Sequence, residues 1–133
     1  MVVMDHMSTF VVVEPLPNEL NSTTFAKALY KVLLQFGLAH TCVVDADSKF
    51  QAEFTETLKL LKIHRYPLAR GNHNGMLVER FNRFLNDSLT IFLNDRGTNR
   101  TFLEGSYLAA YARNSAPVVG TDMSRSLVAI GRE

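Results

Sequence analysis

Two acidic residues, Asp45 and Glu79, have neighbours that would let a carboxylate do chemistry. Asp45 follows an apolar run typical of a β-strand, and Glu79 precedes Arg80 in a basic stretch. Carboxylate oxygens are the ligands that Mg²⁺ and Mn²⁺ prefer. A pair of such ions activates a water or a 3′-hydroxyl for in-line attack on a phosphodiester. The two acids therefore predict metal-assisted phosphoryl transfer if the fold brings them together.

The residues near Glu79 favour a nucleic acid as the partner. Residues 57–83 hold six basic side chains and one acid, a local excess of five positive charges (6 − 1), and such a cluster favours a polyanion. The candidates for contacts with phosphates, sugars or bases are Asn82, Arg83 and Asn86 on the helix face of Glu79, and Asn72 and His73 in the loop before that helix. Taken alone, a solvated helix face would explain the same pattern.

The composition indicates one globular domain. At 133 residues the chain suits a single core, and 47% hydrophobic with 20% charged residues is typical of a globular protein. No run reaches the roughly 18 apolar residues of a membrane-spanning helix, and the start lacks the basic region of a signal peptide. Cys42 is the single cysteine, and the four histidines lack zinc-ligand spacing. We therefore expect an intracellular, reducing compartment, without a disulfide or structural zinc.

Hydrophobic periodicity predicts an α/β domain, with a mixed sheet flanked by helices. The expected strands are residues 1–4, 10–13, 40–44 and 63–66. The expected helices are one that Asn21 or Ser22 caps and Gly37 stops, one capped by Ser48, 74–94, 101–113 and a short terminal helix. Pro67 is expected to end the fourth strand, because proline has no N–H for a ladder. In the helix 101–113, the shared face of Leu103, Tyr107 and Tyr111 is expected to meet the core.

Residues 43–50 (VVDADSKF) and 71–83 (GNHNGMLVERFNR) together resemble the integrase catalytic core of long-terminal-repeat retrotransposons and retroviruses, the D,D-35-E group. The resemblance covers nearly the whole chain and implies a ribonuclease H-like fold. It implies that Asp45 and Glu79 are the second and third catalytic, metal-binding acids, with Mg²⁺ or Mn²⁺ as cofactor. Their separation of 33 residues (79 − 45 − 1) is slightly short for the group, and a shorter loop near residues 67–72 would absorb the difference.

The same resemblance implies a DNA partner and a reaction. Members of the family process the 3′ ends of element DNA and transfer them into target DNA. Asn82, Arg83 and Asn86 would lie along the face that engages the DNA end, with Asn72 and His73 in the loop beside it. A homo-oligomer in the full-length parent, and action in the nucleus of a eukaryotic host, are the matching expectations.

The resemblance also implies a missing piece. In the family, the first metal-binding aspartate lies in a strand before the one that begins here near Met1, so this chain is expected to lack that strand and that acid. Asp5 is the remaining candidate for a substitute. Residues 1–133 are therefore expected to form a single core-like domain that is incomplete at both ends and inactive as it stands, which leaves its status as an enzyme open.

Two interpretations follow from the sequence. The first is an integrase core from a mobile element, and the alternative is a non-catalytic remnant that binds nucleic acid or associates with itself. The first predicts that the carboxylates of Asp45 and Glu79 approach within about 4 to 8 Å, the range for sharing one or two metal ions. The missing central strand predicts an exposed sheet edge, and with it low stability or association.

Overall fold

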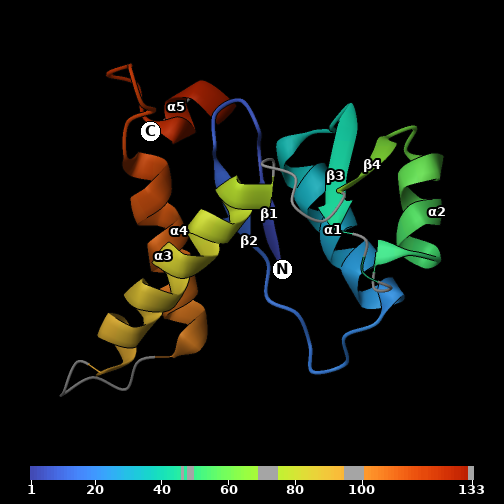
Figure 1. Cartoon of the computed structure of the whole chain (residues 1–133), viewed down its shortest axis with the longest axis horizontal. Helices are drawn as coiled ribbons and strands as arrows, with labels where there is room; N and C mark the ends of the chain where they lie inside the picture. Colours follow the sequence, from blue (N-terminus) through green and yellow to red (C-terminus); the bar gives the residue numbers. More distant parts are fainter. Residues whose placement is uncertain (46, 48–49, 69–74, 95–100, 132–133) are drawn as a thin grey trace. The chain divides into compact units, whose positions relative to one another are not determined.

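The chain combines strands and helices, which alternate between an opening hairpin and three closing helices, and this confirms the predicted α/β class (Figure 1). The computed structural model describes residues 1–45, 47, 50–68, 75–94 and 101–131. The chain divides into two compact units, the first formed by Met1 with Glu14–Gly75 and the second by Val2–Val13 with Met76–Glu133. Each unit contains one two-stranded sheet and its own hydrophobic core.

The first unit combines a parallel sheet with two helices. Its elements are α1 (Ser22–Phe36), β3 (Thr41–Asp45), α2 (Glu53–Leu60) and β4 (His64–Leu68). Its core is made mainly by Phe25, Leu29, Leu33, Val44, Phe54, Leu58 and Ile63. The side chain of Asn21 accepts a hydrogen bond from the Thr24 N–H at 2.9 Å, and α1 ends before Gly37, whose φ of 97° suits glycine. The predicted first helix is therefore confirmed.

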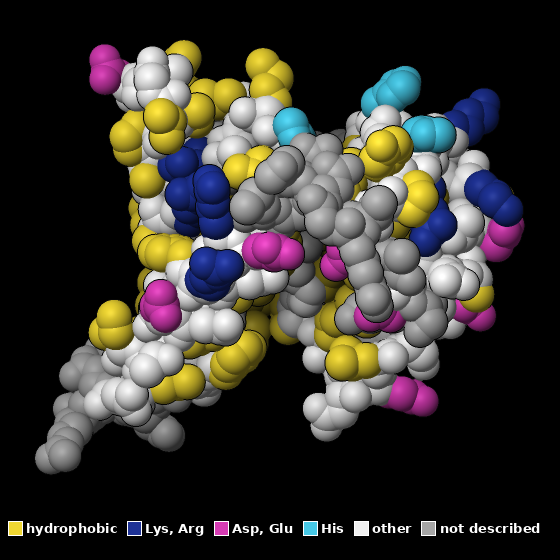
Figure 2. Space-filling view, viewed as in Figure 1, with side chains coloured by type: hydrophobic (Ala, Val, Ile, Leu, Met, Phe, Trp, Pro, Cys, Tyr) yellow, Lys and Arg dark blue, Asp and Glu magenta, His cyan; other side chains and the backbone are white. Residues whose placement is uncertain are grey.

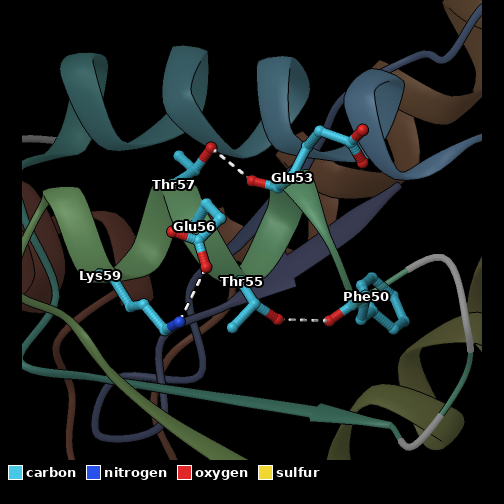
Figure 3. Close-up of polar contacts among 6 residues, drawn as sticks. All are labelled: Phe50, Glu53, Thr55, Glu56, Thr57 and Lys59. Atoms are coloured by element: carbon cyan, nitrogen blue, oxygen red, sulfur yellow. Dashed lines mark hydrogen bonds and ion pairs between the residues drawn. The ribbon is translucent and has the colours of Figure 1, made fainter.

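Helix α2 buries one apolar stripe and pairs its polar side chains locally (Figure 3). The Thr57 hydroxyl donates to the Glu53 carbonyl at 2.8 Å, and Lys59 contacts Glu56 at 2.7 Å. The Thr55 hydroxyl donates to the carbonyl of Phe50 at 3.2 Å, which ties the helix to the segment before it. The helix begins five residues after Ser48, the cap expected from the sequence, and Ser48 itself lies outside the described residues.

The prediction that Pro67 ends the fourth strand is wrong, because β4 continues through it. The His64 N–H donates to the His40 carbonyl at 3.0 Å, so residue 64 directs its backbone groups towards β3. Alternate residues of a strand bond to opposite sides, so Tyr66 and Leu68 also bond towards β3 and Pro67 faces the outer edge. A proline that lacks only an outward N–H does not interrupt the ladder, and it prevents further pairing there.

The second unit combines an antiparallel hairpin with three helices. Its elements are β1 (Val2–Met4), β2 (Val11–Val13), α3 (Gly75–Asn94), α4 (Phe102–Ser115) and α5 (Arg125–Ile130). Its core contains Val11, Phe81, Leu85, Leu89 and Ala109, with Val2, Met4 and Val13 packed against them. The predicted hairpin, the predicted long helix and the predicted terminal helix are all confirmed.

Helix α4 turns the opposite face to the core from the one predicted. Tyr107 and Tyr111 are 47% and 71% exposed, and Leu103 is also exposed. The buried face consists of the small residues Gly105, Ser106, Ala109 and Ala110, together with Asn114. A Cβ atom at Gly105 would lie 2.8 Å from side-chain atoms of Leu89 and Phe92. The close approach of α3 therefore requires small residues, and the larger side chains of α4 face outwards.

A buried arginine joins the hairpin turn to the C-terminal segment. Arg125 is 4% exposed, and its Nε donates to the Thr9 hydroxyl at 2.8 Å. Its Nη1 donates to the carbonyls of Ala116 and Pro117 at 2.8 and 2.9 Å, and to that of Arg113 at 3.3 Å. No helix in the described part of the chain is both long and apolar enough to cross a membrane.

Candidate metal and nucleic-acid site

Asp45 is the last residue of β3, as predicted, and its side chain is exposed. The preceding Val44 is buried in the core of the first unit, which anchors the end of the strand. Within the described residues, the Asp45 carboxylate has no hydrogen-bond or ion-pair partner.

Glu79 lies in the second turn of α3 and is also exposed. Phe81 and Leu85 anchor the opposite side of the helix in the core of the second unit. No described residue makes a hydrogen bond or an ion pair with the Glu79 carboxylate. Glu79 and Asp45 are thus alike in being exposed and in having no carboxylate partner among the described residues.

The helix positions that follow Glu79 carry the predicted DNA-binding residues. Asn82, Arg83 and Asn86 stand three, four and seven residues later, and all three are exposed. Residues three or four apart are neighbours on a helix surface, with their Cβ atoms about 5–6 Å apart. Figure 2 shows basic and acidic side chains on the same side of the unit that contains α3 and α4. The predicted polar face of α3 is confirmed, and its binding to DNA stays a prediction.

The two acids belong to different units, Asp45 to the first and Glu79 to the second. The predicted approach of their carboxylates therefore stays a prediction. Asn72 and His73 lie outside the described residues. In the described ranges no group of three or more His, Cys, Asp or Glu side chains is placed to hold a metal ion.

Asp5, the candidate substitute for the first acid, serves the hairpin turn. Its Oδ2 accepts hydrogen bonds from the Ser8 N–H at 2.7 Å and from the Ser8 hydroxyl at 2.6 Å. Burial raises the pKa of the Asp5 carboxyl, but these hydrogen bonds outweigh it and hold that pKa below its usual value. These contacts give Asp5 a structural role in the hairpin turn.

The basic residues of segment 57–83 are divided between the two units. Lys59, Lys62 and Arg65 belong to the first unit, whereas Arg80 and Arg83 belong to the second. Lys59 already pairs with Glu56, and Arg70 lies outside the described residues. The exposed arginines of α3 are therefore the basic groups nearest in sequence to Glu79.

Comparison with solved structures decides the fold. The BIV integrase catalytic core domain superimposes with a TM-score of 0.79 at 20% identity, covering 98% of this chain and 84% of that one. The HTLV-2 integrase catalytic core domain in complex with magnesium, in a trimeric form, gives a TM-score of 0.78 at 20% identity over 96% of this chain and 82% of that one. This chain has the fold of a retroviral integrase catalytic core. The predicted ribonuclease H-like fold is thereby confirmed.

A larger assembly shares this integrase-core fold. A chain of the simian T-cell lymphotropic virus intasome, in complex with PP2A regulatory subunit B56 gamma, matches with a TM-score of 0.82 at 20% identity. The match covers 97% of this chain and 47% of that chain, so the present sequence spans about half of its length. No protein-family model matches the sequence, and comparison with curated proteins finds no relative.

Sequence reasoning missed two polar side chains that hold the integrase-core fold together. One is Arg125, and the other is Asn114, whose amide bonds to both backbone groups of Val11. The local sequence around Asn114 and around Arg125 looks like that of any solvent-exposed polar residue in a helix. Their partners lie more than 100 residues away for Asn114 and for the Arg125 contact with Thr9, so no local spacing would have revealed them.

Proposed function

We propose that this chain is an integrase-type catalytic core whose parent element joins the 3′ ends of its DNA to target DNA. Asp45 and Glu79 would be its metal-binding, catalytic acids. The observation that carries the proposal is the fold, in which these two exposed acids stand at a strand end and in a helix without competing partners in the described chain.

The residues fit Mg²⁺ or Mn²⁺ in the kind of donor that they offer. Both are carboxylates, the oxygen ligands typical of these ions, and both are free of the hydrogen bonds that occupy Asp5. When bound, the metal would polarise the phosphodiester and lower the pKa of the attacking hydroxyl or water. The similar HTLV-2 core is a magnesium complex, which supports the choice of ion.

The exposed face of α3 would bind the DNA. Arg83 offers a fork of donors suited to phosphate oxygens, and Asn82 and Asn86 offer amides that hydrogen-bond to sugars and base edges. The resemblance adds Asn72 and His73 to this set. In a eukaryotic host the target would be nuclear DNA, which makes the nucleus the expected site of action.

We expect residues 1–133 by themselves to bind metal and DNA more readily than they catalyse. The two-metal mechanism clamps the attacking and leaving oxygens between ions, and the proposed ligands supply two acids for that task. Asp5, engaged by Ser8, is the lesser candidate for a third. Cleavage and strand transfer would therefore be weak or absent with this segment alone.

One observation favours the alternative, a non-catalytic and self-associating domain. Helix α4 exposes the large apolar side chains of Phe102, Leu103, Tyr107, Leu108 and Tyr111 along its length. Large exposed apolar groups on one helix are typical of an interaction surface. The similar HTLV-2 cores occur in dimeric and trimeric forms, so a homo-oligomer is compatible with either function.

Metal-dependent DNA binding tests the proposal. Fluorescence anisotropy with a short labelled duplex bearing a 3′ overhang would be recorded with Mg²⁺, with Mn²⁺ and with EDTA. We expect metal to strengthen binding to the wild type, and Asp45→Asn or Glu79→Gln to remove that gain. Asp87→Asn, another exposed acid of α3, is the matched control and should bind like the wild type. Equal metal response in all four proteins would refute the assigned ligands.

Replacing the basic side chain of the same face separates DNA contacts from metal contacts. Arg83→Ala should weaken DNA binding both with metal and with EDTA, because it removes a phosphate contact. Glu79→Gln should weaken it only when metal is present. DNA binding that survives in EDTA but never responds to metal would favour the non-catalytic alternative.

A further inference from the structure

The connection between β3 and α2 begins directly after Asp45, and the ring of Phe50 anchors it in the first unit. This ring makes edge-to-face contacts with Phe25 and Phe54, whose ring centroids lie 5.2 and 5.1 Å away. The Phe50 carbonyl accepts a hydrogen bond from the Thr55 hydroxyl at 3.2 Å (Figure 3). The chain is therefore held at the point where it approaches α2.

A strained turn follows Phe50. The Phe54 N–H donates to the Gln51 carbonyl at 3.1 Å, and Ala52 between them has φ 44° and ψ −120°. These angles are close to those of the first central residue in a type II′ turn, a position that glycine favours because a Cβ atom is strained there. A strained residue of this kind persists only where its surroundings hold it in place.

The hydroxyl of Ser22, the first residue of α1, holds this turn from a distant part of the chain. It donates to the Gln51 carbonyl and accepts from the Phe54 N–H at 3.1 Å, so it contacts both backbone groups that close the turn. Ala52, at the N-cap position of α2, makes no side-chain capping hydrogen bond. Ser22 thus takes the place of a capping side chain, and relaxation of Ala52 would break its contacts.

We propose that Ser22 is a positioning residue for Asp45, acting through the turn at Ala52. The inference rests on the proposed function, in which Asp45 binds the metal. Residues 46–51 separate Asp45 from Ala52, so the connection is short. The ladder with β4 fixes one end of it, and Ser22 fixes the other. Metal ligands need support that holds them within about 0.5 Å of a productive geometry, and this pair of anchors supplies it for the carboxylate of Asp45.

The strain makes the turn depend on Ser22. An alanine released from these contacts would leave the positive-φ region, which is costly for a residue with a Cβ atom, and the connection would move with it. A glycine at position 52 would keep the turn without that cost. Substitutions at positions 22 and 52 together therefore distinguish positioning of the turn from general stability.

Calorimetric Mn²⁺ titrations of these variants test the inference. Ser22→Ala should weaken Mn²⁺ binding by roughly tenfold or more, the usual effect of removing a group that supports a metal ligand. Ser22→Thr retains the hydroxyl and should bind like the wild type, and Ala52→Gly added to Ser22→Ala should restore most of the affinity. Leu33→Ala, in the core of the same unit, is the control. It should lower the melting temperature without changing the Mn²⁺ affinity at temperatures where the variant is folded.

Amide hydrogen exchange at Phe54, recorded without metal, reports on the turn itself. Exchange should be faster in Ser22→Ala than in the wild type, because the amide loses one of its two acceptors. It should be slow again in the double variant with Ala52→Gly. Unchanged exchange in Ser22→Ala would overturn the inference whatever the Mn²⁺ affinity does.

Asp45→Asn separates failure of this inference from failure of the proposed function. If Asp45→Asn binds Mn²⁺ like the wild type, the proposed function is wrong and Ser22 has no metal ligand to position. If Asp45→Asn loses Mn²⁺ affinity and Ser22→Ala does not, the positioning role alone is refuted. A loss in Ser22→Ala that Ala52→Gly fails to reverse would refute the strained turn as the link between Ser22 and Asp45.

Discussion

Three aspartate and glutamate residues that look alike in the sequence differ in what their oxygen atoms contact. Asp5 accepts two hydrogen bonds from Ser8, whereas the carboxylates of Asp45 and Glu79 meet no partner among the described residues. The spacing of Asp5 and Ser8 is that of a side chain closing its own turn, so this role was readable from the sequence. The lack of described partners for Asp45 and Glu79 could not be read from the sequence, because it depends on residues distant in the chain.

Asp5 should make stability depend on pH in the acid range. Its pKa in the folded protein lies below the unfolded value of about 3.9, so its contribution is present above that value and is lost as the pH falls through the folded pKa. In urea titrations, wild type should be more stable than Asp5→Asn at pH 7, and the difference should shrink below about pH 4. Asp122 is another exposed acid, so Asp122→Asn serves as the control. A stability difference between wild type and Asp5→Asn that stays the same at every pH would contradict this explanation.

Cys42 should react slowly while the protein is folded. Burial raises the pKa of its thiol to about 11, so little of the nucleophilic thiolate is present at pH 8. We expect slow reaction with a disulfide reagent at that pH, and fast reaction after unfolding in urea. Equally fast reaction in both states would show that the thiol is accessible.

At the scale of elements, periodicity predicted helix positions better than it predicted which face packs. It located α1 and α3 within a residue or two and assigned Phe81 and Leu85 of α3 correctly to the core. It failed on α4, where large residues are the usual choice for a core face. At Gly105 the helices approach so closely that small residues form the core face instead of large ones. The regular spacing of the small residues along α4 was the signal that could have predicted this face.

Adding a side chain at Gly105 should destabilise the second unit. A valine there would press against Leu89 and Phe92, and overpacking of this kind costs roughly 1–3 kcal/mol. Leu108→Val, on the outer face of α4, is the control, since it introduces the same branched side chain without the close contact. Denaturant unfolding should place Gly105→Val well below that control. Equal stability of the two variants would mean that α3 and α4 are not tightly packed at this point.

At the scale of the whole molecule, the strand and helix order and the resemblance together predicted the integrase-core fold, which the solved structures confirm. The predicted sheet is present as two separate pairs of strands, one antiparallel and one parallel. No local pattern in the sequence shows which edge of β4 Pro67 faces or that Asn114 bonds to Val11, because both depend on partners distant in the chain. The sequence likewise proposes Asp45 and Glu79 for a site, and their approach within about 4 to 8 Å stays a prediction.

The central claim is that Asp45 and Glu79 serve the same metal site, and a double-mutant cycle on Mn²⁺ affinity tests it most directly. Calorimetric titrations would compare the wild type, Asp45→Asn, Glu79→Gln and the double variant. For a shared site, each single variant should lose most of the Mn²⁺ affinity of the wild type. The double variant should then bind Mn²⁺ only slightly more weakly than the weaker-binding single variant. Losses that simply add, or affinities that do not change, would mean that the two acids do not share a metal ion.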